Sequence, residues 1–300
     1  MYKNLNATVL GVSGRQSELI ELAMTYGFRG LDIDIVDLVK RTQRSEFEKA
    51  ARYLLSAKML VSGFETPIDL DSDDATFEKT LALLPATIEI AGKVNARAGF
   101  LRLPAATDRL PFHEYFDVLR KRVDRIAEIF AANKVMLGLY FSTAIENREN
   151  RQFKFIQDVD GFLAFFHACT NESVGLVIDT FNWIVGGGNL DHLTSLTVEK
   201  ILCVRLASSP EEFDISSASI DQRMMPTKDG LVDNSAIAKK LYAEGYRSSV
   251  TAFPSPAALG GKTRDAALAN VVESLDEIFA SADIPIAGRK LEAQPMMAGR

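Results

Sequence analysis

The stretch Val174-Gly-Leu-Val-Ile-Asp179 is a short aliphatic run that ends in a carboxylate. An aliphatic run of this length is typical of a strand that is buried in a parallel sheet. A carboxylate in such a strand is costly unless it is paired or binds a ligand. Asp179 therefore predicts a polar site at the carboxyl end of a buried strand.

Similar short runs recur along the chain and alternate with longer helical patterns. The other expected strands are residues 8–12, 30–35, 59–63, 99–103, 136–141, 201–206 and 249–252. The expected helices are residues 15–26, 45–56, 74–93, 112–133, 159–169, 191–196, 235–244 and 263–281. In one of them, a 3.6-residue period of apolar side chains is formed by Leu119, Val123, Ile126 and Phe130.

Eight strand–helix units in a chain of 300 residues match the size of a (β/α)8 barrel. A doubly wound sheet also alternates, but it has a glycine-rich fingerprint after the first strand, and Val12-Ser-Gly-Arg15 does not match it. We therefore expect a single (β/α)8 TIM barrel over residues 1–283 and a poorly ordered tail over residues 284–300. The long segments 142–158 and 207–234 should cover the active-site end.

The composition limits the partners and the compartment. The chain is 47% hydrophobic and 25% charged, with a net charge of −6 and a pI of about 5.3, so we expect no binding to nucleic acid or to an anionic membrane. Cys169 and Cys203 lie in apolar surroundings and should be free thiols, which favours a cytoplasmic location. We expect neither a signal peptide nor a membrane-spanning segment.

Charged residues within the strands predict a polar cluster inside the barrel. Barrel strands alternate between inward-pointing and helix-facing residues, and the helix-facing positions must be apolar. In the run Gly30-Leu-Asp-Ile-Asp-Ile35 the carboxylates of Asp32 and Asp34 should therefore point inward. The same parity places four more side chains inward: Arg102, Tyr140, Asp179 and Arg205. The cluster is either a closed set of Asp–Arg salt bridges or an anion site formed by arginines.

Several stretches resemble the xylose isomerase-like TIM barrels, the sugar phosphate isomerase/epimerase superfamily. They are Ser62-Gly-Phe-Glu-Thr-Pro-Ile-Asp69, Met136-Leu-Gly-Leu-Tyr-Phe141, Val174-Gly-Leu-Val-Ile-Asp-Thr-Phe-Asn-Trp183 with Gly186-Gly-Gly188, Arg223-Met-Met-Pro-Thr-Lys-Asp-Gly230 and Leu241-Tyr-Ala-Glu-Gly-Tyr246. Their order along nearly the whole chain implies the same barrel and a related ligand.

The resemblance also implies a divalent metal held by a glutamate after strand five, an aspartate after strand six, a histidine on strand seven and a glutamate after strand eight. Those four positions are Tyr140, Asp179, Arg205 and Phe253, so Asp179 is the only family ligand that this chain keeps. An arginine adds positive charge where the cation would bind. We therefore expect no metal or other cofactor.

Other positions of the family pattern are partly kept. Asn182 replaces the histidine that follows the strand-six aspartate, Ser208 replaces an aspartate after strand seven, and Lys228 replaces a glutamate of the seventh loop. Arg223 and Pro226 of that loop match the pattern. The inherited metal-dependent chemistry should therefore be lost or changed.

We expect a divergent sugar isomerase/epimerase-like barrel of carbohydrate metabolism, possessing altered chemistry or no activity (a pseudoenzyme). Its ligand would be a small polyhydroxylated or anionic molecule, namely a sugar, sugar acid or sugar phosphate, at the carboxyl ends of the strands. The expected substrate-binding residues are Asp32, Asp34, Arg102, Tyr140, Asn182, Arg205, Arg223 and Lys228.

The main alternative is an active isomerase or epimerase with Asp179 or Glu65 as the proton acceptor. Arginines would then stabilise an enediolate, or Mg²⁺ or Mn²⁺ would bind the carboxylates of Asp32, Asp34 and Asp179. A further alternative is a non-catalytic interaction scaffold, and a homodimer is compatible with each of these functions. An open pocket with Asp179 not locked to Arg205 would favour catalysis. A cleft filled by Tyr140, Phe253 and closed Asp–Arg pairs would favour a ligand-binding or purely structural role.

Overall fold

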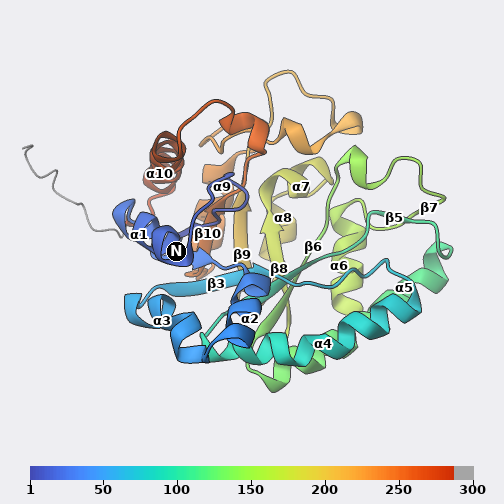
Figure 1. Cartoon of the computed structure of the whole chain (residues 1–300). Coiled ribbons are helices and arrows are strands. Elements are labelled where there is room, and N and C mark those ends of the chain that lie inside the picture. Colours follow the sequence, from blue (N-terminus) through green and yellow to red (C-terminus); the bar gives the residue numbers. More distant parts are fainter. Residues whose placement is uncertain (287–300) are drawn as a thin grey trace, which may run out of the picture.

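Eight parallel strands close into a barrel in the computed structural model of the chain, which describes residues 1–286 (Figure 1). The strands are β1 (Tyr2–Leu5), β2 (Gly30–Asp32), β3 (Leu60–Glu65), β4 (Ala98–Arg102), β6 (Met136–Tyr140), β8 (Val174–Asp179), β9 (Ile201–Leu206) and β10 (Ser249–Ala252). Each pairs with its neighbours in chain order, and β1 pairs with β10 to close the barrel. The predicted (β/α)8 TIM barrel is confirmed.

Helices surround the barrel and cover the outer face of its strands (Figure 1). They are α1 (Gln16–Thr25), α2 (Ile35–Arg44), α3 (Phe47–Ala57), α4 (Asp74–Lys93), α5 (Phe112–Ala132), α6 (Val159–Ala168), α7 (Thr180–Val185), α8 (Leu190–Thr194), α9 (Asn234–Ala243) and α10 (Arg264–Ser281). Five 3₁₀ turns in the described residues are η1 (Ile145–Asn147), η2 (Val198–Lys200), η3 (Ile215–Ser217), η4 (Ile220–Gln222) and η5 (Pro256–Leu259). A small antiparallel sheet of β5 (Ala106–Thr107) and β7 (Phe153–Lys154) lies outside the barrel.

The hydrophobic core fills the space between strands and helices. The predicted apolar stripe of α5 is buried in full, as are the facing aliphatic side chains of β6 and β8. Ile284 also packs into this core, while residues 287–300 of the expected tail lie outside the described residues. No helix within residues 1–286 is both long and apolar enough to cross a bilayer.

The prediction of a first strand at residues 8–12 is wrong. Those residues form a turn in which Gly11 has a φ of 64° and Val12 N–H donates to the Ala7 carbonyl at 2.9 Å. The true strand β1 is less apolar because it contains Lys3, which is buried and paired with Asp276 of α10 at 2.7 Å. Because this buried lysine has a carboxylate partner, the strand tolerates a charge and lacks the apolar pattern by which the other strands were recognised.

Two helices that the sequence did not reveal, α2 and α7, begin within three residues of a strand end. Asp34 accepts a hydrogen bond from the backbone N–H of Asp37 and caps α2, and Asp179 accepts one from Asn182 and caps α7. Aspartate is a favoured N-cap because its carboxylate satisfies a backbone donor that the first turn leaves free. The two aspartates that were singled out for a site therefore cap helices, and Asp179 is also the last residue of its strand.

A phenylalanine ring fills the barrel interior below the mouth. A Cβ atom at Gly63 would lie 2.2 Å from the ring of Phe100, so the missing side chain at Gly63 makes room for that ring. Phe100 is 1% exposed and lies under the guanidinium of Arg205, 4.8 Å from ring centroid to guanidinium carbon. The Phe100 ring thus lies directly beneath the polar groups of the mouth.

We predict that Gly63→Ala lowers the free energy of unfolding by about 1–3 kcal/mol, because an added methyl group in a packed core forces side chains out of place. Chemical denaturation measures the change. The double variant Gly63→Ala/Phe100→Leu should lose less free energy of unfolding than the sum of the losses in the two single variants. Additive losses would show that the ring and the glycine are not coupled.

Candidate functional site

A buried arginine lies at the centre of the barrel mouth. The guanidinium of Arg205 in β9 is surrounded by three aromatic rings, with centroids 4.8, 4.6 and 4.4 Å away for Phe100, Tyr140 and Phe253. Its Nη2 donates to Oε1 of Glu65 at 2.6 Å, and the Arg205 side chain is 1% exposed. We call these five residues the arginine cage. Two of its rings, Tyr140 and Phe253, stand at positions where the family resemblance implied metal ligands.

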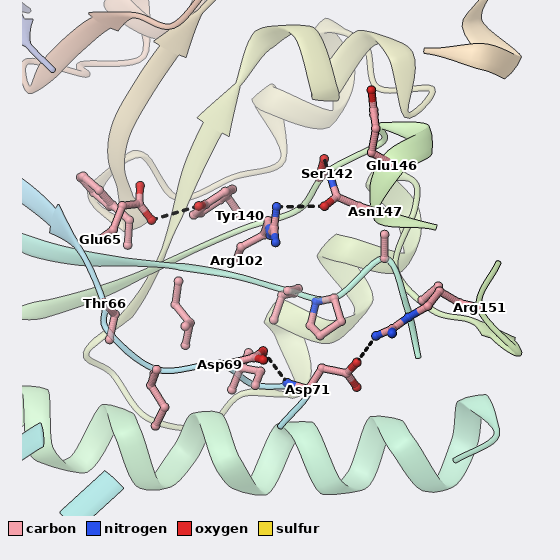
Figure 2. A pocket seen from close by; sticks show the side chains of 18 residues that line it. Glu65, Thr66, Asp69, Asp71, Arg102, Tyr140, Ser142, Glu146, Asn147 and Arg151 are labelled. Atoms are coloured by element: carbon pink, nitrogen blue, oxygen red, sulfur yellow. Dashed lines mark hydrogen bonds and ion pairs between the residues drawn. The ribbon is translucent and has the colours of Figure 1, made fainter. Parts of the chain in front are cut away.

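The carboxylate of Glu65 connects the arginine cage to solvent. Its second oxygen, Oε2, accepts a hydrogen bond from the hydroxyl of Tyr140 at 2.9 Å (Figure 2). The side chain of Glu65 is 54% exposed. Burial, together with the charge of Glu65, raises the pKa of Tyr140 to about 12. Tyr140 is therefore a neutral hydrogen-bond donor near pH 7, and Glu65 is the charged group of the cage that a ligand can reach.

A second ion pair closes the side of the mouth next to the arginine cage. Oδ2 of Asp179 accepts a hydrogen bond from Nη2 of Arg223 at 2.5 Å, and both side chains are buried. Arg223 also donates through Nε to the backbone carbonyl of Phe253 at 3.1 Å. The expected Asp–Arg pairing therefore exists, but Asp179 pairs with Arg223, and Arg205 pairs with Glu65.

The groups at this mouth do not fit a divalent cation. Asp179 is the register partner of Arg205 on the neighbouring strand and is already bound by Arg223, so a cation here would face two guanidinium groups. Hard cations need several oxygen ligands. Within residues 1–286, no group of three or more His, Cys, Asp or Glu side chains could hold a metal. The carboxylate set Asp32, Asp34 and Asp179 is not assembled, because Asp34 is exposed at the start of α2.

Asp32 lies at the other side of the barrel mouth, at the end of β2. Its two oxygens accept hydrogen bonds from the side-chain amides of Asn4 and Asn6, each at 3.0 Å. Burial raises the pKa of the Asp32 carboxyl to about 6, although the charge of Arg205 and both amides oppose this shift. Asp32 also lines a cavity of about 880 Å³ that lies between the β1–α1 and β2–α2 connections. The inward direction predicted for Asp32 agrees with these contacts, and that for Asp34 is wrong.

We predict that the stability contributed by Asp32 falls as the pH rises from about 4 to about 6. The folded chain has the higher pKa, so it binds the proton more tightly than the unfolded chain, whose carboxyl titrates near 3.8. A shift of this size corresponds to about 2 kcal/mol between pH 4 and pH 7. The free energies of unfolding of the wild type and Asp32→Asn, measured across this range, should diverge by that amount. Parallel curves would contradict the raised pKa.

An open cavity of about 490 Å³ lies beside the arginine cage, at the carboxyl ends of β3, β4 and β6 (Figure 2). Arg102 of β4 projects into it, and its Nη1 donates to Oδ1 of Asn147 at 3.0 Å. Asn147 in turn donates through Nδ2 to Oγ of Ser142 at 2.9 Å. Within residues 1–286, Arg102 has no carboxylate within salt-bridge distance, so its charge is not neutralised by an ion pair. We call this space the strand-end cavity.

Carboxylates and a second arginine form the outer wall of the strand-end cavity. Asp71 accepts hydrogen bonds from the side chains of Thr107 at 2.6 Å and Tyr115 at 2.5 Å, and it forms an ion pair with Arg151 (Figure 2). Arg151 also reaches Asp108 at 3.1 Å. This arginine belongs to the long segment that was expected to cover the mouth, and it connects that segment to the β3–α4 connection.

The structure brings together only some of the residues singled out from the sequence. Arg102, Tyr140 and Glu65 line the strand-end cavity, whereas Arg205, Asp179 and Arg223 lie in the closed pairs beside it. Two others lie apart from it. The Oδ1 atom of Asn182 accepts two hydrogen bonds from buried Thr143, and Lys228 pairs with Glu277 of α10 at 3.1 Å.

Several cavity residues were not found from the sequence, because each is an ordinary loop residue whose neighbours are distant in the chain. They are Asp69, Asp71, Ser142, Glu146, Asn147 and Arg151. The length of the segment after the fifth barrel strand pointed to four of them, whereas Asp69 and Asp71 lie in the β3–α4 connection. A long segment at the carboxyl end of a barrel strand usually contributes to the site.

The fold and the sequence define the family of this chain. The model of the xylose isomerase-like TIM barrel family matches residues 20–252, and the chain belongs to this family. No curated protein matches the sequence. The family resemblance noted from the sequence is therefore confirmed.

Solved structures share this fold at low sequence identity. A xylose isomerase domain protein from Alicyclobacillus acidocaldarius subsp. acidocaldarius is 22% identical over 94% of this chain and 99% of that chain, with a TM-score of 0.83. The IolI protein with a bound zinc atom is 15% identical over 94% and 99% of the two chains, with a TM-score of 0.79. D-Psicose 3-epimerase with D-tagatose from Clostridium cellulolyticum H10 is 13% identical over 94% and 99%, with a TM-score of 0.67.

Proposed function

We propose that this chain binds a small, polyhydroxylated anion, a sugar acid or a sugar phosphate, in the strand-end cavity without a divalent metal. The observation that carries this proposal is Arg102, an exposed guanidinium that points into a cavity and has no carboxylate partner among the described residues. A cavity of about 490 Å³ is within the usual size range for small-molecule sites. The epimerase of the same fold, which was solved with D-tagatose, supports a sugar-like ligand.

The charges at the mouth support the proposed loss of metal-dependent isomerisation. The cation position is held by the guanidinium of Arg205, which is covalently part of the chain, and Asp179 already has Arg223 as its counter-ion. A metal ion would have to displace Arg223 and lie close to a second fixed positive charge. The free-energy cost of leaving buried Arg223 unpaired is about 3–5 kcal/mol. Metal binding at Asp179 is therefore disfavoured in this chain.

Ligand binding can be tested by thermal unfolding in EDTA with a panel of sugar acids and sugar phosphates at constant ionic strength. A ligand that binds only the folded state must raise the melting temperature. We expect Arg102→Gln to weaken the binding by about tenfold to a hundredfold, the usual value for hydrogen bonds to charged groups. Arg125→Gln is the matched control, because Arg125 pairs with Glu78 on the outer helices. Stabilisation that is equal in both variants would place the ligand elsewhere.

We predict that Mn²⁺, Mg²⁺, Co²⁺ and Zn²⁺ do not raise the melting temperature of the EDTA-treated protein and do not bind with 1:1 stoichiometry. Elemental analysis by mass spectrometry after gel filtration measures the metal content. A stoichiometric metal that is lost in Asp179→Asn would contradict the metal-free site. Asp179→Asn is preferred to alanine because its side-chain oxygen can still cap α7.

A second candidate is metal-independent isomerisation or epimerisation with Glu65 as the proton acceptor. The favouring observation is that the Glu65 side chain accepts a hydrogen bond from Tyr140 and lines the strand-end cavity together with Arg102. Under this proposal, a ligand identified in the thermal screen should exchange a carbon-bound proton for deuterium in D₂O, as seen by NMR, and Glu65→Gln should abolish the exchange. If the ligand binds and none of its carbon-bound protons exchanges, the chain is better described as a pseudoenzyme.

We also propose a reducing compartment such as the cytoplasm, because Cys169 and Cys203 are both free thiols. Burial raises the pKa of the Cys203 thiol to about 11 and that of Cys169 to about 12. Both thiols are therefore uncharged and unreactive near pH 7, as expected for structural cysteines.

A further inference from the structure

The hydrogen-bond directions along one wall of the strand-end cavity leave donors free for a ligand. Asn147 accepts from Arg102 and donates to Ser142, and the backbone N–H of Ala144 also donates to the Ser142 hydroxyl oxygen at 3.3 Å. The oxygen of Ser142 is thus an acceptor in both contacts, so its own hydrogen is available. Of the five N–H groups of Arg102, one is used by Asn147. This wall, formed by Arg102 and Ser142, is a donor wall.

The rest of the cavity presents acceptors. Glu65, Asp69, Asp71 and Glu146 line it, against the guanidinium groups of Arg102 and Arg151. Glu65 and Asp71 are neutralised by Arg205 and Arg151, while neither Asp69 nor Glu146 has a cationic partner within residues 1–286. Uncompensated carboxylates accept hydrogen bonds from hydroxyl groups and repel additional negative charge.

This charge distribution discriminates between the two anions that the proposed function allows. A phosphate monoester has a charge of about −1.5 to −2 near pH 7, and proteins usually hold such groups with glycine-rich loops, helix N-termini or several cations. None of the described residues that line the cavity is a glycine, and Arg102 is its one guanidinium without a carboxylate partner. A carboxylate has a single charge and matches the planar fork of one arginine.

We propose that the strand-end cavity selects a polyhydroxylated carboxylic acid, of the aldonic or uronic acid class, over the corresponding sugar phosphate. The carboxylate of the ligand would bind Arg102 and Ser142, and its hydroxyl groups would donate to Glu65 and Asp69. This inference rests on the proposed function, because it requires that an anion binds in this cavity at all. Asn147 is a positioning residue that fixes the guanidinium of Arg102 and the hydroxyl of Ser142.

The test compares acids and phosphates of the same carbon number by isothermal titration calorimetry in EDTA at constant ionic strength. The probes are D-gluconate with D-glucose 6-phosphate, and D-xylonate with D-ribose 5-phosphate, with sorbitol as the neutral control. Each acid should bind at least tenfold more tightly than its phosphate partner. Arg102→Lys, which keeps the charge but loses the fork, should weaken the acids, and Ser142→Ala should weaken them by about twofold to tenfold. Arg125→Gln should bind as the wild type does.

The outcomes separate this inference from the proposed function. Phosphates that bind as tightly as the acids, and still depend on Arg102, would overturn the acid selectivity and leave the proposed function in place. Acids that bind equally to the wild type and Arg102→Gln would overturn the placement of the carboxylate on the donor wall. If no probe binds to the folded wild type, both proposals fail. Circular dichroism of each variant shows whether it is folded, which is expected because Arg102 is exposed.

Discussion

The barrel mouth depends on one buried positive charge, the guanidinium of Arg205. Removing an ion from water costs several kcal/mol, and such a group persists only when its surroundings compensate for that loss. The compensation comes from Glu65, which accepts one hydrogen bond, and from the rings of Phe100, Tyr140 and Phe253. Aromatic faces attract cations most strongly where water is excluded. The residues around Arg205 are therefore those that suit a fixed organic cation, and few of them suit a metal ion.

This constraint explains the neighbouring groups. Asp179, beside Arg205 in register, takes Arg223 as its own partner, so two ion pairs close the axis of the barrel. The strand-end cavity lies to one side of these pairs, over the ends of β3, β4 and β6, and Glu65 belongs both to the arginine cage and to the wall of this cavity. A ligand in this cavity would contact Glu65 directly, and it would interact with Arg205 only indirectly, through Glu65.

The sequence was sufficient where one strand or helix determines its own conformation. β8, β9 and β10 have the predicted bounds, and every residue of these three strands is buried. β1 was missed because Lys3 is paired with Asp276, a residue from the other end of the chain. Asp34 was misplaced because β2 ends at Asp32, after which the alternation of a strand no longer applies.

The alternation of inward and outward residues along the strands correctly predicted that four side chains lie at the barrel mouth: Arg102, Tyr140, Asp179 and Arg205. It could not predict which residues these side chains pair with. Glu65 and Arg205 are 140 positions apart in the chain, and Asp179 and Arg223 are 44 positions apart. Which carboxylate meets which arginine depends on strand register and on loop conformation, and a single sequence contains no direct signal for either. The strand-end cavity was hidden for the same reason, since its donor wall joins β4 to the loop after β6.

We propose that fixed arginines stand in place of a metal at the barrel mouth and that the ligand binds beside them. The most direct measurement is a crystal structure of the protein soaked with Mn²⁺ and D-gluconate, with anomalous data collected near the manganese edge. We predict no anomalous peak at Asp179, an intact Asp179–Arg223 pair, and ligand density between Arg102 and Glu65. A manganese peak bound to Asp179, with Arg223 displaced, would contradict it.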